Sequence, residues 1–388
     1  MAAPAWVSGS AQSSSQSTKR QTTVVAVGDS ITANGLTAQN DLANGLIGKL
    51  DGKNWLMWAS LLSGGKLVYA GALGTGGYTS AQVLANHVPV AIATAADMVV
   101  LQMGTNDIGS LSLAQTRANM LAACQQIQAA GKVPVLCTLT PRNDILGTQS
   151  ITQINLAYQR LALENGWPLV DWYTALLDTS TGGWQSGDNS DNVHPTVQGA
   201  KKMGQKFADV MPGGSGSGGA PYQHITSTPG LSLVTNPLMV DTNSDGIPDD
   251  YSTPSGSATN ACANGSAGEI GKVWTVTRSA ADSSWNHSIG MAVTAGHRIL
   301  VTCKLGSVAK APGGSIAVRL CTNDSVTHAF SLEQNWTEDI PAGSLLNVIT
   351  RVPAGVTTLT WRGSVMGAAN TKLSTSQVFI TDLDANGL

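Results

Sequence analysis

The sequence is poor in charged and in aromatic side chains. Charged residues make up 12% of the 388 residues and aromatic residues 5%, and this charged fraction is about half of that in an ordinary soluble domain. The net charge is −3, and the 21 basic residues are scattered without runs. We therefore expect neither nucleic acid nor an anionic membrane surface as a partner.

Long apolar runs are also absent. No stretch approaches the ~18 apolar residues of a membrane-spanning helix, so no membrane span is expected. Residues 1–20 lack the basic start and continuous apolar stretch of a secretory signal peptide, and their Ser, Gln and Ala content predicts a flexible leader. Low charge with abundant Ser, Thr, Ala and Gly is typical of secreted or surface-assembled proteins, so we expect an extracellular, secreted or virion-associated location.

The five cysteines show no metal-binding pattern. No C-x-x-C pair is present, which argues against a zinc site. Cys124 and Cys137 fall in an expected helix and an expected strand, where free thiols commonly act as small apolar side chains. Cys303 and Cys321 are left as candidates for a disulfide within the C-terminal part.

Residues 21–212 alternate between strand and helix patterns. Strands are expected at 24–27, 66–70, 97–103, 133–137 and 168–170, and helices at 42–62, 79–87, 112–130, 151–164 and 196–209. Continuous apolar strands separated by helices predict a parallel sheet covered on both faces, here a three-layer α/β/α flavodoxin-like domain. Ligands bind such sheets at the carboxyl ends of the strands, and Ser30 follows the first strand.

Residues 213–220 are rich in Gly and Ser and predict a flexible linker. Residues 221–388 then show short apolar runs at 273–276, 298–302, 315–318, 356–361 and 378–380, which predict an all-β sandwich or jelly roll. The tryptophans of this part fit either a sugar-stacking platform or core packing. They are Trp274, Trp285, Trp336 and Trp361.

Three side chains suggest nucleophilic chemistry. Ser30 follows a buried strand, and Asp191 lies three residues before His194. In an activated hydroxyl nucleophile the imidazole takes the proton and the carboxylate orients and stabilises the imidazolium. His87 is the other histidine before the linker, and its place at a helix end predicts a capping role, which leaves His194 as the base. Asp188 competes with Asp191 for the orienting role.

These residues lie in four blocks that, in this order, resemble the SGNH (GDSL-like) hydrolase family. The blocks are Gly28-Asp29-Ser30-Ile31-Thr32, the glycine stretch 72–79, Gly104-Thr105-Asn106-Asp107 and Asp191-Asn192-Val193-His194. The resemblance covers residues 28–210 and implies catalysis by Ser30, Asp191 and His194. No G-x-S-x-G motif is present, which argues against the α/β-hydrolase fold.

The resemblance also implies an oxyanion hole formed by the Ser30 and Gly74 amides and the Asn106 side chain. Gly76 and Gly77 are rival donors to Gly74, and Ala72 departs from the Asn that is usual two residues before the oxyanion glycine. The resemblance implies esters as substrates and no cofactor for catalysis. With an appended β domain, we favour O-acetylated carbohydrate. The alternatives are a broad short-chain esterase or lipase, and a surface or phage-tail glycan-binding protein with a vestigial site.

A second candidate site is the loop 241–250. Asp241, Asn243 and Asp245 place oxygen atoms at alternate positions before a turn-forming glycine, as a Ca²⁺ loop requires. Ser252 stands where an EF-hand has its bidentate Glu, and Asp249 is the substitute ligand that we expect. A solvated turn without metal is the alternative reading.

Overall fold

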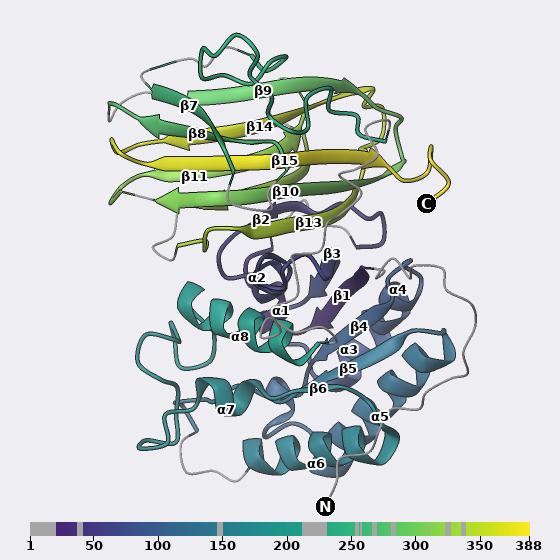
Figure 1. The fold of residues 1–388 in the computed structure, drawn as a ribbon. Helices are drawn as coiled ribbons and strands as arrows, with labels where there is room; N and C mark the ends of the chain where they lie inside the picture. Colours follow the sequence, from purple (N-terminus) through teal and green to yellow (C-terminus); the bar gives the residue numbers. More distant parts are fainter. Residues whose placement is uncertain are drawn as a thin grey trace, which may run out of the picture.

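The computed structural model describes residues 21–36, 42–145, 150–211, 231–252, 256, 258–265, 270–280, 285–309, 311–322, 327–334 and 339–388. The expected leader at 1–20 and the expected linker at 213–220 lie outside this set. Figure 1 shows an α/β half and, above it, a half built of β-strands.

The α/β half contains a parallel sheet of five strands. They are β1 (Thr22–Gly28), β3 (Leu67–Gly74), β4 (Met98–Gln102), β5 (Val133–Cys137) and β6 (Leu169–Val170). Their order in the sheet is β6-β5-β4-β1-β3, and each neighbouring pair is parallel. This is the flavodoxin-like order, in which the chain reverses direction across the sheet beside the first strand. The predicted fold class is confirmed.

Helices cover both faces of this sheet. They are α1 (Ser30–Ala33), α2 (Trp55–Leu62), α3 (Ser80–Asn86), α4 (Val88–Ile92), α5 (Leu113–Ala129), α6 (Ser150–Asn165), α7 (Trp172–Leu176) and α8 (Val197–Val210), with a 3-10 turn η1 (Thr105–Asp107). Alternate residues of a strand face opposite sides, so Val24 and Ala26 join one core with α2, α7 and α8. Val25 and Val27 join the other core, with α3 to α6. None of the described helices is long and apolar enough to cross a membrane.

The C-terminal half is a sandwich of two antiparallel sheets. Its strands are β7 (Ala258–Asn264), β8 (Lys272–Arg278), β9 (Trp285–Ala292), β10 (Arg298–Ala309), β11 (Ser315–Cys321), β12 (His328–Gln334), β13 (Ser344–Arg351), β14 (Thr358–Met366) and β15 (Lys372–Asp382). One sheet has the order β13-β10-β15-β8-β7 and the other β12-β11-β14-β9. The predicted β-rich second half is therefore present.

Two expectations about this half need correction. Trp274 and Trp361 are fully buried in the core, so neither can stack on a sugar; the side chains of Trp285 and Trp336 lie outside the described set. Cys303 and Cys321 are free thiols, on β10 and β11 of the two different sheets, so the suggested disulfide is wrong. Their spacing in the sequence did not show that an apolar layer separates them.

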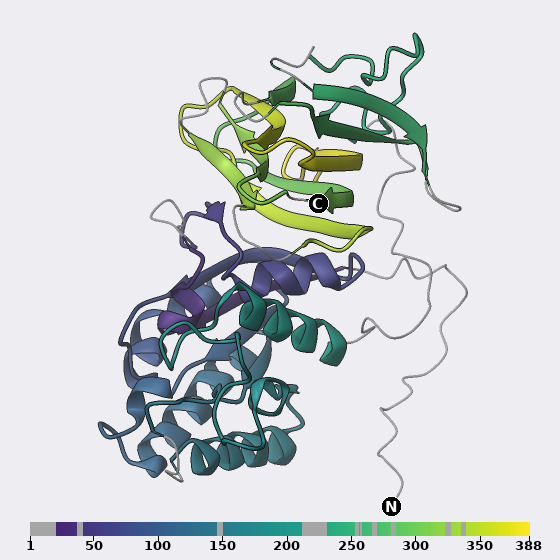
Figure 2. The ribbon, with the colours of Figure 1, turned by 90° about the vertical axis from the view of Figure 1, so that its left-hand side faces the viewer.

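The two halves share sheets and a core. β13 pairs with the edge strand β3 in parallel, with Val348 opposite Tyr69, so the sheet of the α/β half continues into the sandwich. The Ser60 hydroxyl on α2 donates to the Asn347 carbonyl at 3.0 Å. Figures 1 and 2 show the sandwich lying over the side of the α/β half formed by α2 and β3. The apolar residues of α2 and of the sandwich belong to one continuous core.

The helix expected at 42–62 is wrong in its first half. Residues Gly48–Leu50 form the strand β2, which pairs in parallel with β12 of the sandwich, and only Trp55–Leu62 is helical. Gly45 and Gly48 adopt positive φ angles of 71° and 62°, which interrupt a helix. The partner of β2 comes from about 280 residues later in the chain, where no local pattern could indicate it.

Candidate active site

Ser30 is the first residue of a helix that starts directly after a buried strand. The Asp29 side chain caps this helix by accepting a hydrogen bond from the Ile31 amide at 2.9 Å. Gly28 permits this tight turn: a Cβ there would lie 2.3 Å from both the Gln102 carbonyl oxygen and the Thr32 hydroxyl. The turn therefore presents the Ser30 hydroxyl at the carboxyl edge of the sheet, where it is half-buried.

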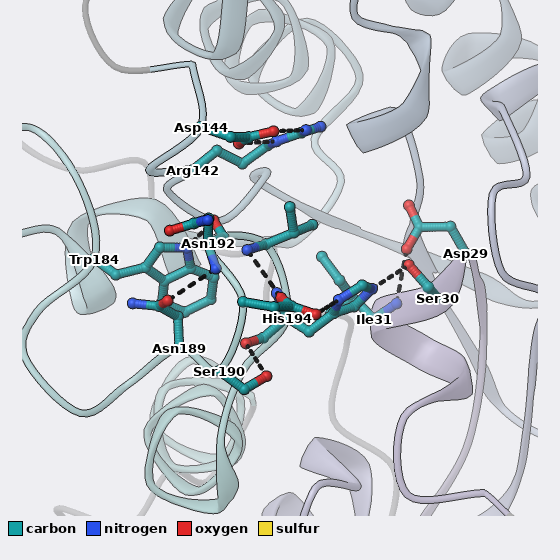
Figure 3. Close-up of polar contacts among 12 residues, drawn as sticks. Asp29, Ser30, Ile31, Arg142, Asp144, Trp184, Asn189, Ser190, Asn192 and His194 are labelled. Carbon is teal, nitrogen blue, oxygen red and sulfur yellow. Dashed lines mark hydrogen bonds and ion pairs between the residues drawn. The ribbon is translucent and has the colours of Figure 1, made fainter.

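The hydroxyl, the imidazole and one carboxylate form a continuous chain of contacts. His194 Nε2 lies 2.7 Å from Ser30 Oγ (Figure 3). On the other side of the ring, His194 Nδ1 lies 2.7 Å from Asp191 Oδ2. Because a carboxylate only accepts, Nδ1 carries the proton and Nε2 is free to accept the serine proton. This is the arrangement that raises the nucleophilicity of a serine.

Asp191 is held in place by the turn that it begins. Its Oδ1 accepts the amide hydrogens of His194 at 2.8 Å and of Val193 at 3.2 Å. Burial raises the pKa of Asp191, but these hydrogen bonds and the imidazole lower it more, so its pKa lies below the ordinary value. Asp191 is therefore ionised at neutral pH.

Asp188, the competing acid, is engaged elsewhere. It is fully buried, and its oxygens accept from Lys202 Nζ at 2.8 Å and from the Gln198 amide at 2.9 Å. The Lys202 ammonium therefore forms an ion pair with this carboxylate. Asp191, and not Asp188, contacts His194.

The loop that carries His194 is fixed by residues that the sequence did not single out. Asn192 lies in the left-handed region with φ 75°, and its carbonyl accepts from the indole of Trp184 at 3.1 Å and from the Asn143 amide at 3.0 Å. The Asn143 side chain in turn accepts from the Trp184 amide at 2.9 Å. Figure 3 shows Trp184 beside this loop. Because these contacts are made to a backbone carbonyl, which every residue has, no sequence motif indicates them.

Gly74 lies against the nucleophile turn. It ends β3 opposite Gly28 of β1, and a Cβ at Gly74 would lie 2.3 Å from the Ala33 nitrogen and 2.7 Å from the Asp29 carbonyl oxygen. Only glycine allows this approach. At the rival positions Gly76 and Gly77, no atom lies within 4 Å of a Cβ position. Gly74 is thus the glycine of this stretch that packs directly on the turn bearing Ser30.

Asn106 lies on η1, just after β4. One hydrogen of its side-chain amide is donated to the Tyr78 carbonyl at 2.9 Å, which orients the group and leaves its second hydrogen for another acceptor. The adjacent Asp107 is buried, and it accepts from the Ser80 amide at 2.7 Å and from the Ser80 hydroxyl. Asp107 therefore links η1 to the start of α3, a structural role.

The carboxyl group of Asp29 is buried beside Ser30. Burial raises its pKa to about 7, although hydrogen bonds from the Ile31 amide and the Gln102 side chain and the nearby His194 all favour the charged form. Gln102 Nε2 donates to Asp29 Oδ2 at 3.3 Å, and Gln102 Oε1 accepts from Thr32 Oγ1 at 3.1 Å. Gln102 thus links β4 to the nucleophile turn, a role that sequence reasoning missed.

His87 caps the end of α3, as its place at a helix end predicts, and it does so with its backbone amide, which donates to the Val83 carbonyl at 2.9 Å. It connects α3 and α4 without a side-chain capping hydrogen bond. Its ring is buried and lies against Gly28 and Thr75 instead. The sequence showed only its position at a helix end, while its partners come from the ends of β1 and β3.

The acidic loop of the sandwich half forms a compact turn. Asp241 Oδ2 accepts from the Gly246 amide at 3.1 Å, Asn243 Oδ1 from the Asp245 amide at 3.1 Å, and Asp245 Oδ1 from the Ile247 amide at 2.8 Å. The carboxylate of Asp249 accepts from the Thr242 amide at 3.2 Å. Among the described residues, no three His, Cys, Asp or Glu side chains are gathered closely enough to hold a metal ion.

A serine, a histidine and an aspartate in contact at the carboxyl edge of a parallel α/β/α sheet are typical of one class of proteins, the hydrolases that work by acyl transfer to a serine. Comparison with known families agrees with this class. Residues 26–202 match the GDSL-like Lipase/Acylhydrolase family. This part of the chain is therefore a GDSL-like hydrolase domain, while the β-sandwich lies outside the match.

Solved structures with a similar fold correspond to about half of the chain. One is described as a lipolytic protein of the G-D-S-L family from Desulfitobacterium hafniense, with 22% identity, covering 49% of this chain and 100% of that one, at a TM-score of 0.40. Another is an acetylxylan esterase from Geobacillus stearothermophilus, with 18% identity, 51% and 100% coverage and a TM-score of 0.42. A GDSL-like lipase from Bacteroides thetaiotaomicron has 20% identity, 50% and 89% coverage and a TM-score of 0.39. No curated protein matches the chain.

Proposed function

We propose that this protein is a serine esterase that uses Ser30, His194 and Asp191, with O-acetylated carbohydrate as the favoured substrate. The observation that carries the proposal is the pair of 2.7 Å contacts that joins the three side chains. No cofactor takes part in the proposed reaction.

The reaction proceeds in two acyl transfers. Ser30 Oγ attacks the ester carbonyl carbon while its proton passes to His194 Nε2. The bond to the alcohol oxygen then breaks, and that oxygen takes the proton from the imidazolium, which leaves an acyl-enzyme. Water attacks the acyl carbon, gives its proton to His194, and the carboxylic acid departs as the proton returns to Ser30. Asp191 stabilises the imidazolium in both halves of the reaction.

The negative charge of each tetrahedral intermediate falls on the carbonyl oxygen. We assign its binding to the Ser30 amide, the Gly74 amide and the free hydrogen of the Asn106 side chain. The Ser30 amide lies in the first turn of α1, where amides have no partner within the helix. Pre-oriented donors of this kind typically contribute ~3–4 kcal/mol each to transition-state stabilisation.

The openness of the site supports a substrate with a bulky alcohol portion. The Asp191 and His194 side chains are 55% and 29% exposed. The loop positions Gly76 and Gly77 face open space, since nothing lies within 4 Å of a Cβ there. Such a surface admits a polymer chain alongside the serine. A polysaccharide substrate accords with an extracellular or virion-surface location.

The proposal is tested by hydrolysis of p-nitrophenyl acetate by the wild type and by Ser30→Ala. We expect loss of turnover in the variant; equal rates for the two proteins would refute the esterase mechanism. Acetate release from acetylated polysaccharides, measured beside release of acid from lipid esters, then tests the substrate class. Preference for lipid or small soluble esters would favour the broad esterase or lipase alternative.

We also propose that the loop 241–250 binds a structural Ca²⁺ ion. Asp241 is 6% exposed, its Oδ2 is turned into the loop, and its Oδ1 is buried without a hydrogen-bond partner. An ionised oxygen in this state is unfavourable unless a cation approaches it. The neighbouring Asn260 Oδ1 on β7 is likewise buried without a partner.

The remaining ligands of this ion would be Asn243, Asp245 and Asp249 together with carbonyl oxygens of the loop, and because the described carboxylates do not converge, the loop would have to close around the ion. Oxygen-only coordination by six to eight ligands is what Ca²⁺ prefers. Gly246 lies directly against the backbone of Asn260. A bound ion would therefore stabilise the contact between this loop and β7, and no catalytic role is assigned to it.

A further inference from the structure

One buried imidazole touches the elements around the active site without taking part in the proton transfers. His87 lies between α3 and α4 and is 4% exposed. Its Nδ1 is 3.1 Å from the Gly28 carbonyl oxygen, and its Nε2 is 3.0 Å from the Thr75 hydroxyl. The ring of Tyr78 stacks on it, with centroids 5.0 Å apart and an interplanar angle of 22°.

These partners determine which nitrogen of the ring carries the hydrogen. A carbonyl oxygen only accepts, so Nδ1 carries the hydrogen and donates it to Gly28. Nε2 is then the acceptor, and the Thr75 hydroxyl donates to it. Burial lowers the pKa of His87 and thereby favours this neutral form, although the hydrogen bond to Gly28 acts in the opposite direction.

Each partner of His87 adjoins one of the proposed oxyanion donors. Gly28 directly precedes Asp29 and Ser30. Thr75 follows Gly74, and its amide also donates to the Gly28 carbonyl at 3.3 Å. The nucleophile turn and the glycine loop are thus joined both through the backbone and through the imidazole.

Tyr78 makes the third connection. While its ring lies on the imidazole, its carbonyl accepts one hydrogen of the Asn106 amide. The direction of the second hydrogen of Asn106 is therefore set by the position of Tyr78. The segments that carry all three donors meet at one side chain.

We infer that His87 is a positioning residue that holds the three oxyanion donors in register with one another. The inference rests on the proposed esterase function and concerns the same site. The polar and stacking contacts of His87 go to Gly28, Thr75 and Tyr78 and not to the serine hydroxyl or His194, so its loss should leave the nucleophile and base intact. It should instead weaken binding of the tetrahedral intermediate more than binding of the ester.

The expected fall in kcat follows from the contribution that each oxyanion donor makes to transition-state stabilisation. Removing one oxyanion donor typically lowers kcat ~10²–10³-fold, and misplacing donors by a fraction of an ångström removes part of that effect. We therefore expect a fall in kcat of about 10- to 100-fold with little change in KM.

His87→Phe keeps a ring against Tyr78 but removes both polar contacts. His87→Asn retains a donor near the position of Nδ1, and Thr75→Val removes only the hydroxyl. A matched control is His328→Gln, which replaces a histidine that is also buried, 8% exposed, but belongs to β12 of the sandwich half. The control should change stability and leave kcat unaltered.

For each folded variant we would measure kcat and KM on p-nitrophenyl acetate per titrated serine, and the affinity for phenylboronic acid, which forms a tetrahedral adduct with a serine hydroxyl. In His87→Phe we expect kcat and boronate affinity to fall together by about 10- to 100-fold, with KM within about threefold. His87→Asn should recover part of the loss, and Thr75→Val should show a smaller loss.

The inference is overturned if His87→Phe keeps kcat per titrated serine within threefold of the wild type, or if only the number of titratable serines falls. Should that variant not fold, wild-type kcat and boronate affinity in both His87→Asn and Thr75→Val would overturn it equally. A failure of the esterase proposal can be distinguished from a failure of this inference. If the esterase proposal fails, the wild type and Ser30→Ala hydrolyse the ester at the same rate.

Discussion

Both halves of the molecule contain a histidine paired with an aspartate, but the two pairs have different roles. In the α/β half His194 contacts Asp191, an exposed carboxylate, and its second nitrogen meets Ser30 at 2.7 Å. In the sandwich half His297 Nδ1 lies 2.9 Å from Asp382, whose side chain is only 7% exposed and also accepts from the Ala385 amide. The second pair closes a turn at the end of β15.

The difference comes from strand direction. In a parallel sheet the carboxyl ends of all strands lie at one edge, so the residues that follow β1, β3 and β4 gather there. Neighbouring strands of the sandwich are antiparallel, so their ends alternate between the two edges. The residues that follow the strands of the α/β half therefore gather at one edge, while those of the sandwich are divided between two edges.

The two halves share a sheet, and deletion of the sandwich is the most severe test of how far each half depends on the other. A chain that ends after Met211 leaves β3 as an open edge and uncovers the side of α2 that packs against β13, where the Ser60 hydroxyl bonds to the Asn347 carbonyl. We expect most of the truncated protein to be insoluble or unfolded, as measured by soluble yield and circular dichroism.

The full chain, expressed and purified in parallel, is the control for this truncation. A soluble 21–211 fragment with the melting temperature and esterase activity of the full chain would show that the shared sheet contributes nothing to folding, and the two halves would then be independent domains.

Substituting the aspartate of each histidine–aspartate pair tests whether the two pairs have different roles. Asp191→Asn keeps the shape of the side chain but removes the charge that stabilises the imidazolium, so kcat should fall about 10³- to 10⁴-fold. Asp382→Asn should leave kcat within twofold of the wild type and lower the melting temperature instead. Steady-state kinetics and thermal unfolding measure both; similar kinetic losses in the two variants would contradict the distinction.

The buried carboxyl of Asp29 predicts a pH-dependent stability that arises in the α/β half. Its pKa in the folded protein is about 7, above the value of the unfolded chain. At a pH between these two values, the folded state therefore keeps a proton that the unfolded state has lost. Stability from this group is complete at low pH and declines as pH rises through the folded pKa. Between pH 5 and 8 the decline is at most about 2–3 kcal/mol.

Asp29→Asn removes this titration and keeps an acceptor for the Ile31 amide. The stability of the wild type relative to this variant should therefore fall between pH 5 and pH 8, as measured by urea unfolding at both values. A constant difference between the two proteins across this range would mean that Asp29 does not titrate there.

The smallest effect concerns the acidic loop of the sandwich. At a tenfold excess over its Kd, Ca²⁺ should stabilise the protein by about 1.4 kcal/mol, a rise of a few degrees in melting temperature that EDTA reverses. Asp241→Asn should abolish the rise, while the exposed neighbour Asp250→Asn should keep it. Identical melting curves of the wild type in calcium and in EDTA would remove the metal proposal.

Much of the α/β half could be predicted because its signals are local. A buried parallel strand is an uninterrupted apolar run, and β1, β4 and β5 appear in the sequence within two residues of their observed bounds. Ser30, Asn106 and His194 could be proposed as site residues because each lies in a short block of fixed spacing. Asp191 needed only the three-residue offset that lets its carboxylate reach the imidazole.

What escaped prediction depends on contacts between distant segments. The strand at Gly48–Leu50 forms because β12 offers it a partner, although its sequence reads as part of a helix. Trp274 and Trp361 are core residues because two sheets close over them. His87 looks like a residue at a helix end, and only the folded chain brings Gly28 and Thr75 to its ring.

The order of apolar runs, helices and short motifs thus determined by itself the fold class and the candidates for nucleophile and base, since strand and helix periods and turn chemistry act over a few residues. The tertiary structure alone decided that β2 pairs with β12, that Gly28 and Thr75 meet at the ring of His87, and that the two halves share one sheet. Those outcomes depend on which surfaces are left to be buried once the local elements have formed, and burial is a property of the whole chain.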